Sequence, residues 1–271
     1  MSAPQKAKAL AKRILGRHPM VTVPPAVANT YVEAGNQWYR PTLGGALTLA
    51  PRLGGGRVVR EALAILDRLG EDVYLTFVRN FYLAGLAKYG DGWRYADINT
   101  ALVGLAEVLQ PAAYLEIGVR RGRSLAMVAS KAPACHIVAC DLFIENYANM
   151  ENPGPDFVRS EVQRFGFSGT LEFIVGDSTR VLSPFFDERP GLFFDIITVD
   201  GDHTAAGAHA DLINVMPRLK IGGALVFDDV SNPSHPELGQ VWRDTVVARS
   251  ELSTFTFDEI GFGVGVAIRH A

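Results

Sequence analysis

The chain has 271 residues, of which 48% are hydrophobic and 20% are charged, and its formal net charge is −3. This composition is typical of a folded globular protein and excludes a disordered one. The acidic pI, near 6.1, argues against nucleic acid as a partner. The longest apolar runs, such as residues 125–129, are too short for an integral membrane span. Because Cys135 and Cys140 lack a CxxC spacing, we expect reduced thiols in a cytoplasmic protein.

The chain begins with a basic segment. Five lysines and arginines precede the first acidic residue, Glu33, and these are Lys6, Lys8, Lys12, Arg13 and Arg17. We expect a short amphipathic helix here, either a solvated or partner-docking helix or a membrane-surface or targeting segment. Residues 19–56 are rich in proline and glycine without clean periodicity, so we expect an irregular wrapping segment.

Three stretches with the apolar spacing of helices follow, at 57–70, 72–89 and 96–109. The last stretch stops before Pro111, which cannot continue a helix. We therefore expect a helical and irregular N-terminal region, residues 1–110, that packs on the rest of the chain. This region would cover a site or form the subunit contact of a homo-oligomer.

After Pro111, short β-branched runs alternate with helical stretches, which is the pattern of a parallel sheet flanked by helices. The expected strands are 114–119, 136–142, 171–175, 195–199, 224–228, 255–259 and 264–269. Only residues 260–263 separate the last two strands, a spacing that suits an antiparallel hairpin. The predicted fold of residues 111–271 is therefore α/β and Rossmann-like, with a seven-stranded, mostly parallel sheet and a terminal antiparallel hairpin.

The turn after the first strand is the first candidate for ligand binding, because ligands of open α/β sheets lie at the carboxyl ends of the strands. In this turn Gly118 permits close backbone approach, and Gly122 lets the next helix pack near the strand. A dinucleotide fingerprint needs glycines where Arg120 and Arg123 stand, which disfavours a pyrophosphate ligand. With Glu116 at the strand end, the turn suits a ligand that carries an amino acid group and a nucleoside.

The ends of the second and third strands add polar groups that suit such a nucleoside. Asp141 can accept hydrogen bonds from ribose hydroxyls, and Leu142 and Phe143 can flank an adenine. The sequence Gly176-Asp177-Ser178 places polar atoms to contact the edge of that base. The alternative for each acid is a helix cap or a turn residue.

The fourth and fifth strands end in acids. If these strands are neighbours, Asp200, Asp228 and Asp229 converge at one edge of the sheet. Clustered carboxylates repel one another unless a cation joins them, and oxygen ligands suit Mg²⁺ or, less specifically, Mn²⁺ or Ca²⁺. The alternative is that each acid caps the following helix. His203 is either a functional group or a helix-terminal histidine, and His235 is a weaker candidate for a substrate cleft.

Together these residues resemble the class I S-adenosylmethionine-dependent methyltransferases. The motifs are Glu116-x-Gly118-x-x-x-Gly122-x-Ser124, Asp141, Gly176-Asp177-Ser178, Val199-Asp200-Gly201-Asp202-His203 and Phe227-Asp228-Asp229. Within that superfamily the chain is similar to the metal-dependent O-methyltransferases, which include the catechol and macrolide-sugar enzymes. In the catechol enzymes an Asp-Asn pair stands where this chain has Asp228-Asp229.

The resemblance implies a role for each of these residues. A magnesium ion would be held by Asp200, Asp228 and Asp229, and His203 would be the catalytic base. The cofactor site would be formed by Glu116, Gly118, Gly122, Ser124, Asp141, Leu142, Asp177, Ser178 and Asp200. The implied activity is transfer of a methyl group from S-adenosylmethionine to a hydroxyl of a small molecule such as a sugar, a polyol or another natural product.

Three other functions remain open from the sequence. A metal-independent S-adenosylmethionine-dependent methyltransferase would use the carboxylates as caps and as partners of the methionine amine. An NAD-dependent oxidoreductase could use the same sheet topology, although Arg120 and Arg123 disfavour it. A non-catalytic binding or assembly protein would act through its N-terminal helices and would transfer no methyl group.

Overall fold

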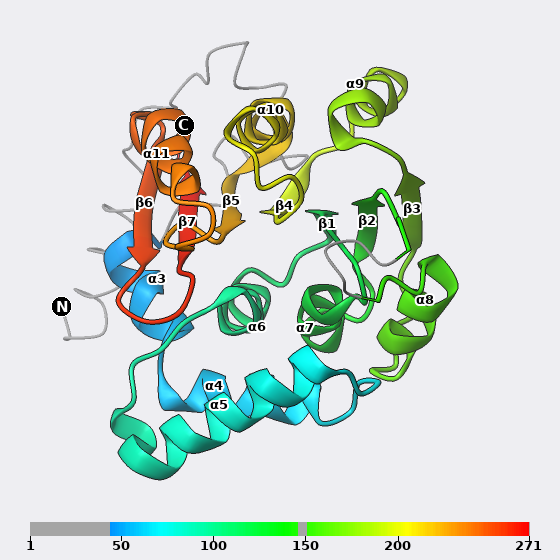
Figure 1. Ribbon diagram of the computed structural model, residues 1–271. Helices are drawn as coiled ribbons and strands as arrows, with labels where there is room; N and C mark the ends of the chain where they lie inside the picture. The colour runs from blue at the N-terminus through cyan, green and yellow to red at the C-terminus, as the bar shows by residue number, and fades with distance from the viewer. Residues whose placement is uncertain (1–43, 146–150, 271) are drawn as a thin grey trace, which may run out of the picture.

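The structure, a computed structural model, describes residues 44–145 and 151–270 (Figure 1). The basic segment at 1–17 and most of the expected irregular segment at 19–56 lie outside the described residues. In the described ranges no helix is long and apolar enough to cross a membrane.

A seven-stranded sheet forms the centre of the molecule, in the order β3-β2-β1-β4-β5-β7-β6. Its strands are β1 (Ala113–Ile117), β2 (His136–Asp141), β3 (Leu171–Val175), β4 (Phe194–Val199), β5 (Leu219–Asp228), β6 (Leu252–Phe257) and β7 (Val264–Arg269). The first five strands pair in parallel, whereas β7 pairs antiparallel with both β5 and β6. The predicted fold class is therefore confirmed.

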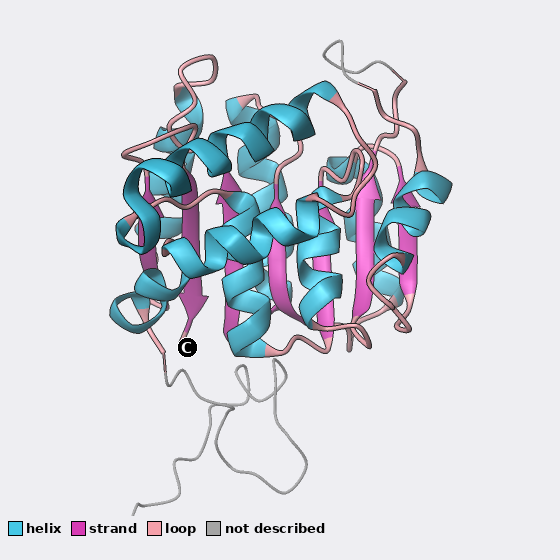
Figure 2. Cartoon of the chain, turned by 90° about the horizontal axis from the view of Figure 1, so that it is seen from below, coloured by secondary structure: helices cyan, strands magenta, loops and turns pink. Residues whose placement is uncertain are grey.

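Helices cover both faces of the sheet (Figure 1). One face carries α9 (Ser178–Glu188), α10 (Ala205–Val215) and α11 (Glu237–Trp242), the last of which continues into a π-helical turn at Arg243–Val247. The other face carries α3 (Ala46–Leu53), α6 (Ile98–Leu109), α7 (Arg123–Lys131) and α8 (Pro155–Gln163), and α4 (Gly56–Leu66) and α5 (Val73–Tyr89) lie outside them. Figure 2 shows α5 crossing in front of the strands.

The alternation of side chains along the strands divides the interior into two apolar clusters, one for each face. On β1, Tyr114 joins the cluster with α4 to α7, and Leu115 joins the cluster with α9 to α11. Because α4, α5 and α6 contribute to the same cluster as the sheet, the N-terminal helices pack on the rest of the chain as expected, with α6 in contact with β4 and β5. The domain boundary at residue 110 remains a prediction.

Local signals fix where the helices before the sheet begin and end. Asp72 caps α5 by accepting a hydrogen bond from the Leu75 amide at 2.5 Å. Asp97 and Thr100 form a capping box at the start of α6. That helix ends at Gln110 in the left-handed conformation, directly before Pro111. The three predicted helices are confirmed to within a few residues.

Three sequence expectations were wrong in detail. Strand β5 begins at Leu219, five residues before the expected 224–228, because Leu219 pairs with Phe194 of β4. Residues 46–53 are helical, not irregular, because Leu49 and Leu53 are buried against the neighbouring elements despite Pro51 within the helix. Strand β6 begins at Leu252, three residues before the expected 255–259, because it pairs along its full length with β7. The connection between these two strands is correspondingly longer than expected.

Candidate active site at the carboxyl ends of the strands

The turn between β1 and α7 depends on two glycines with positive φ angles. Gly118, at φ +87°, donates to the Cys140 carbonyl at 2.9 Å, and a Cβ there would lie 1.8 Å from the carbonyl oxygen of Asp200. Gly122, at φ +74°, begins α7, and a Cβ there would lie 2.7 Å from Val158 of α8. Both glycines therefore allow the turn to pack closely against the protein itself.

Glu116 lies beneath this turn and is fully buried. One of its oxygens accepts a hydrogen bond from Ser124 Oγ at 2.5 Å, and the other accepts one from the Tyr114 hydroxyl. Burial raises the pKa of Glu116 to about 8, the charges of Asp200 and Asp141 add to this increase, and the two hydroxyls oppose it. The carboxyl group thus hydrogen-bonds within the protein, beneath the turn. Contact of Glu116 or Ser124 with a cofactor remains a prediction.

Asp141 joins the glycine turn to the end of β2. Its Oδ2 atom accepts hydrogen bonds from the amides of Val119 at 2.7 Å and Arg120 at 2.8 Å, and its Oδ1 atom accepts one from the Phe143 amide at 2.6 Å. Beside it, the side chain of Leu142 is 46% exposed. This arrangement places an apolar surface next to a carboxylate, where the sequence predicted adenine and ribose.

At the end of β3, the polar residues have partners within the protein. Asp177 caps α9 by accepting a hydrogen bond from the Thr179 amide at 3.0 Å, which is the alternative role that the sequence left open. Ser178 Oγ donates to Asp211 Oδ1 at 2.6 Å. Asp211 is buried on α10, and burial raises its pKa to about 6. The contacts of Asp177 and Ser178 with a base remain predictions.

The three acids after β4 and β5 come together because these strands are neighbours with Val199 opposite Phe227. Burial raises the pKa of Asp228 well above its ordinary value, and the charges of Asp200 and Asp229 raise it further. Asp229, in the left-handed region at φ +63°, accepts a hydrogen bond from the Asn232 amide group at 2.9 Å. Within residues 44–145 and 151–270, no three His, Cys, Asp or Glu side chains are arranged as ligands of one metal ion.

His203 lies between two of these acids. Its Nε2 atom is 3.5 Å from Asp200 Oδ1 and 3.7 Å from Asp229 Oδ2. The hydrogen bond with Asp200 raises the pKa of His203, whereas partial burial lowers it and the surrounding carboxylates raise it further. The ring of His235 packs edge-on against that of His203, with 4.9 Å between the centroids. The histidine is thus oriented by carboxylates at the strand ends.

The sequence did not single out Tyr74, which α5 brings to the same region. Burial raises the pKa of its hydroxyl, and the negative charges of Asp228 and Asp200 contribute. The guanidinium of Arg123 lies 4.4 Å from the centre of the Tyr74 ring. No motif marks Tyr74, because its place depends on how α5 lies relative to α7.

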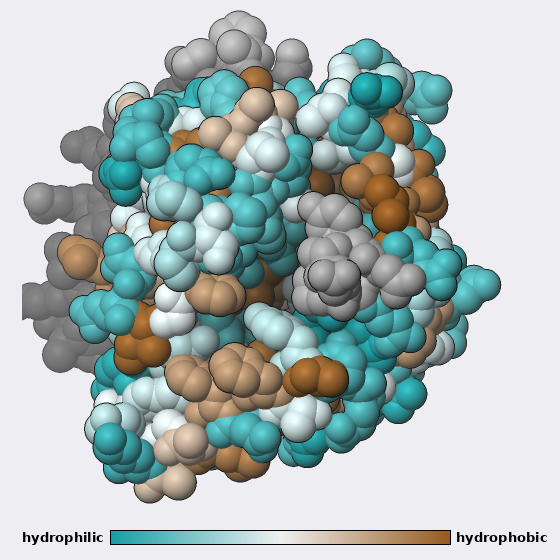
Figure 3. All heavy atoms as spheres, viewed as in Figure 1, coloured by the Kyte–Doolittle hydropathy of each residue, from teal (hydrophilic) through white to brown (hydrophobic). Residues whose placement is uncertain are grey.

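Figure 3 shows that the face with the strand ends is hollowed near its centre.

Comparison with known proteins identifies the fold. Residues 115–230 match the family model for a methyltransferase domain. No curated protein matches the sequence. Among solved structures, the O-methyltransferase TomG from Streptomyces achromogenes, involved in tomaymycin synthesis and in complex with SAM, is 21% identical, with a TM-score of 0.52 over 75% of this chain and 92% of that one.

Two further structures have the same architecture. An O-methyltransferase from Bacillus cereus in complex with SAH is 16% identical, with a TM-score of 0.50 over 79% of this chain and 90% of that one. CalS11, a TDP-rhamnose 3′-O-methyltransferase of calicheamicin biosynthesis, is 17% identical, with a TM-score of 0.50 over 79% and 93% of the two chains. At these identities the likeness establishes the class I methyltransferase fold.

Proposed function

From the premise that this chain contains a class I S-adenosylmethionine-dependent methyltransferase domain, we propose that it transfers a methyl group from S-adenosylmethionine to a hydroxyl of a small-molecule acceptor. The observation that carries the proposal is the position of His203 Nε2 between Asp200 and Asp229, on a loop that contacts the glycine turn at Gly118. A histidine held by carboxylates is suited to remove a proton from a hydroxyl near neutral pH.

The residues around the glycine turn fit the cofactor. Leu142 and Val175, at the ends of β2 and β3, expose 46% and 59% of their surface and offer an apolar wall for an adenine. Asp141 stands next to this wall, and we assign it to the ribose hydroxyls of the cofactor. The turn contacts Asp141 through the Val119 amide and Asp200 through Gly118, so a cofactor that extends along it can reach from the nucleoside wall to His203.

The proposed reaction is an in-line displacement at the methyl carbon. The acceptor oxygen forms a bond to this carbon as the bond from carbon to sulfur breaks, which leaves S-adenosylhomocysteine. His203 takes the proton of the hydroxyl on its other ring nitrogen, Nδ1, because Nε2 donates to Asp200, and Asp200 and Asp229 stabilise the imidazolium that results. Alignment of oxygen, carbon and sulfur supplies the rest of the acceleration, and such orientation is worth roughly 7–11 kcal/mol in favourable cases.

We also propose that a divalent cation, such as Mg²⁺, assists the reaction. The support is the chemistry of the donors, because Asp200, Asp228 and Asp229 provide the oxygen ligands that Mg²⁺ prefers and a negative charge that needs an opposing one. When bound, such a cation would hold the acceptor oxygen and lower its pKa. The three carboxylates do not converge on one point among the described residues, so binding requires their side chains to turn.

Binding and transfer experiments test this function. Calorimetry with S-adenosylhomocysteine and with NAD should show binding of the first ligand only. Methyl-labelled S-adenosylmethionine should then label sugars, polyols or other hydroxylated natural products in a panel that also contains catechols. Binding without labelling of any acceptor would favour a non-catalytic role. Turnover that EDTA leaves unchanged would favour the metal-independent methyltransferase.

A further inference from the structure

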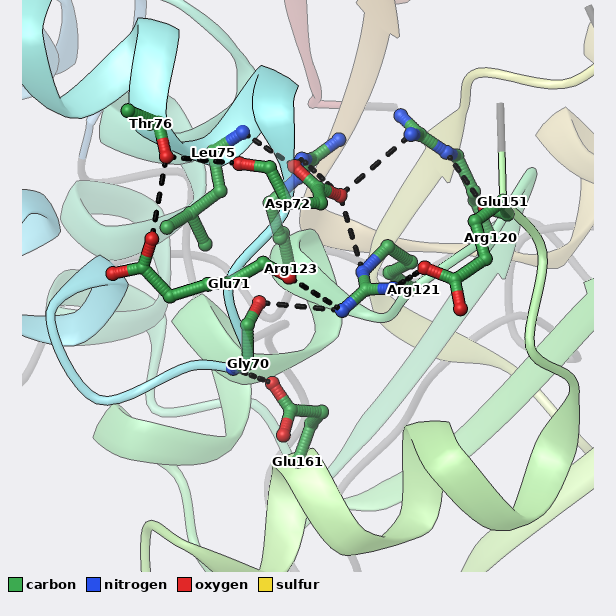
Figure 4. Close-up of polar contacts among 10 residues, drawn as sticks. All are labelled: Gly70, Glu71, Asp72, Leu75, Thr76, Arg120, Arg121, Arg123, Glu151 and Glu161. Carbon is green, nitrogen blue, oxygen red and sulfur yellow. Dashed lines mark hydrogen bonds and ion pairs between the residues drawn. The ribbon is translucent and has the colours of Figure 1, made fainter. Parts of the chain in front are cut away.

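Three arginines of the glycine turn surround a single carboxylate from the start of α5 (Figure 4). Asp72 Oδ2 lies 3.1 Å from Arg121 Nε and 3.7 Å from Arg120 Nη2. Asp72 Oδ1 lies 3.4 Å from Arg123 Nη1. All four side chains are mostly shielded from solvent, with exposures between 6% and 22%. One carboxylate therefore faces three positive charges in a partly buried setting.

Arg121 has a complete set of partners. It has the shortest contact with Asp72, donates to the carbonyl oxygens of Gly70 and Glu71 at 3.3 Å each, and contacts the Glu151 carboxylate. Figure 4 shows how these contacts connect the turn to the chain segment before α5. Arg121 thus has a structural role in joining the two.

Arg120 and Arg123 are less well paired. Their contacts with Asp72 are 3.7 Å and 3.4 Å, longer than the roughly 2.7–2.9 Å of a charge-assisted hydrogen bond. Arg120 otherwise donates to the Glu151 carbonyl oxygen at 3.3 Å, and both guanidiniums lie beside the Tyr74 ring. Burial lowers the pKa of Arg123, as expected for a cation with too little opposing charge. Among the described residues, the three guanidiniums face only two carboxylates, those of Asp72 and Glu151, and this excess of positive charge suits a further anion.

Resting on the proposed function, we propose that Arg120 and Arg123 bind the α-carboxylate of the methionine portion of S-adenosylmethionine. The Arg120 amide donates to Asp141 on the nucleoside side, and Gly118 of the same turn abuts Asp200 on the side of His203. A cofactor that extends between these points passes along the turn from which both guanidiniums project. The single carboxylate of the cofactor can accept paired hydrogen bonds from the N–H groups of a guanidinium.

A pair of ligands that differ in this carboxylate tests the assignment. S-adenosylhomocysteine has the amino acid end, whereas 5′-methylthioadenosine has the same nucleoside and sulfur without it. In calorimetry, Arg123→Met should weaken the binding of S-adenosylhomocysteine about ten- to hundred-fold, because a hydrogen bond between charged groups is lost. The affinity for 5′-methylthioadenosine should stay within about twofold of the wild-type value. Arg120→Met should show the same selectivity and serves as the second variant if the first does not fold.

Arg79 provides the matched control. It pairs with Asp67 and Glu71 from α5 but makes no contact with the turn, so Arg79→Met should leave both affinities unchanged. Equal binding of S-adenosylhomocysteine by the wild type and the Arg123 and Arg120 variants would overturn the inference. An equal loss of affinity for S-adenosylhomocysteine and 5′-methylthioadenosine would also overturn it, because it would show that these arginines only support the turn. A wild-type chain that binds neither ligand would instead overturn the proposed function itself.

Discussion

Gly118 and Asp200 lie so close together that a methyl group on Gly118 would be 1.8 Å from the carbonyl oxygen of Asp200. The same two loops are also joined by a hydrogen bond from the Asp200 amide to the Ile117 carbonyl at 2.9 Å. The glycine turn and the loop that carries His203 therefore form one rigid unit. This contact joins the two parts of the proposed site, which are the turn that would bind the cofactor and the loop whose His203 would accept the proton.

Replacement of Gly118 tests how much the site depends on this contact. Gly118→Ala introduces a side chain at φ +87° and forces the two loops apart. We expect the free energy of unfolding to fall by at least about 2 kcal/mol, and the affinity for S-adenosylhomocysteine to fall as well. Urea denaturation and calorimetry measure the two effects.

Gly191 is the control, because a Cβ there meets no atom within 4 Å. Gly191→Ala should leave the free energy of unfolding within about 0.5 kcal/mol of the wild-type value. If Gly118→Ala is equally harmless, the two loops are not rigidly coupled.

The buried carboxyl of Glu116 predicts a specific pH dependence of stability. Its pKa is about 8 in the folded protein, against an ordinary value of 4.5, so the unfolded chain loses this proton at lower pH. The free energy of unfolding should therefore fall as pH rises through this window, by up to about 1.4 kcal/mol per pH unit, and level off above it. Glu116→Gln, which cannot ionise, should flatten this fall in urea denaturation between pH 5.5 and 7.5.

Glu188, which is exposed on α9, supplies the comparison for this experiment. Glu188→Gln should follow the wild-type pH dependence. If Glu116→Gln also follows it, Glu116 ionises in the folded protein near its ordinary pKa, and the carboxyl is better solvated than its burial indicates.

Much of the fold could be predicted from the sequence because its signals are local. Alternating β-branched runs located five of the seven strands to within two residues, and Pro111 marked the end of α6. The start of β5 was missed because it depends on pairing with Phe194 of β4. The start of β6 was missed because it is set by pairing with β7, which is a non-local effect. Helix α3 was missed because burial of Leu49 and Leu53 outweighs its glycine- and proline-rich surroundings.

The site shows the same division between local and non-local information. The strand-end motifs placed His203 and Asp200 on one loop, and the adjacency of β4 and β5 brings Asp229 to the same histidine. The sequence did not reveal that Glu116 is enclosed by hydroxyl groups, nor that α5 brings Asp72 and Tyr74 to the turn. The contacts of Asp72 and Tyr74 join residues about 50 positions apart in the chain, and no spacing rule encodes them.

We expect Asp228 to lower the free energy of unfolding although the proposed cation site requires it. Its carboxylate is partly buried beside Asp200 and Asp229, and burial together with these two charges raises its pKa. Asp228→Asn removes the repulsion, so in chelator at pH 7 we expect the free energy of unfolding to rise by about 1 kcal/mol. If the proposed cation binds, Mg²⁺ should raise the unfolding midpoint of the wild type more than that of the variant.

The exposed Asp187 on α9 is a suitable control, and Asp187→Asn should change neither quantity. A loss of stability in Asp228→Asn would mean that the carboxylate has a partner that compensates its burial. An equal response of wild type and variant to Mg²⁺ would argue against a cation at this residue.

His203 is expected to control the chemical step and not the binding of the cofactor. With an acceptor found in the labelling panel, His203→Asn should slow methyl transfer about 10²- to 10⁴-fold, because the variant lacks the proposed proton acceptor. The Kd of S-adenosylhomocysteine should change less than about twofold. His270→Asn, at an exposed position near the end of β7, should leave both unchanged.

The pH profile provides a second, independent measure of the same role. The hydrogen bond with Asp200 raises the pKa of His203 above 6.5, and only the neutral imidazole can accept a proton. Wild-type turnover should therefore fall as pH drops, with its midpoint above pH 6.5, and the residual turnover of His203→Asn should lack this midpoint. A variant that keeps both the rate and the midpoint of the wild type would show that the acceptor proton leaves by another route.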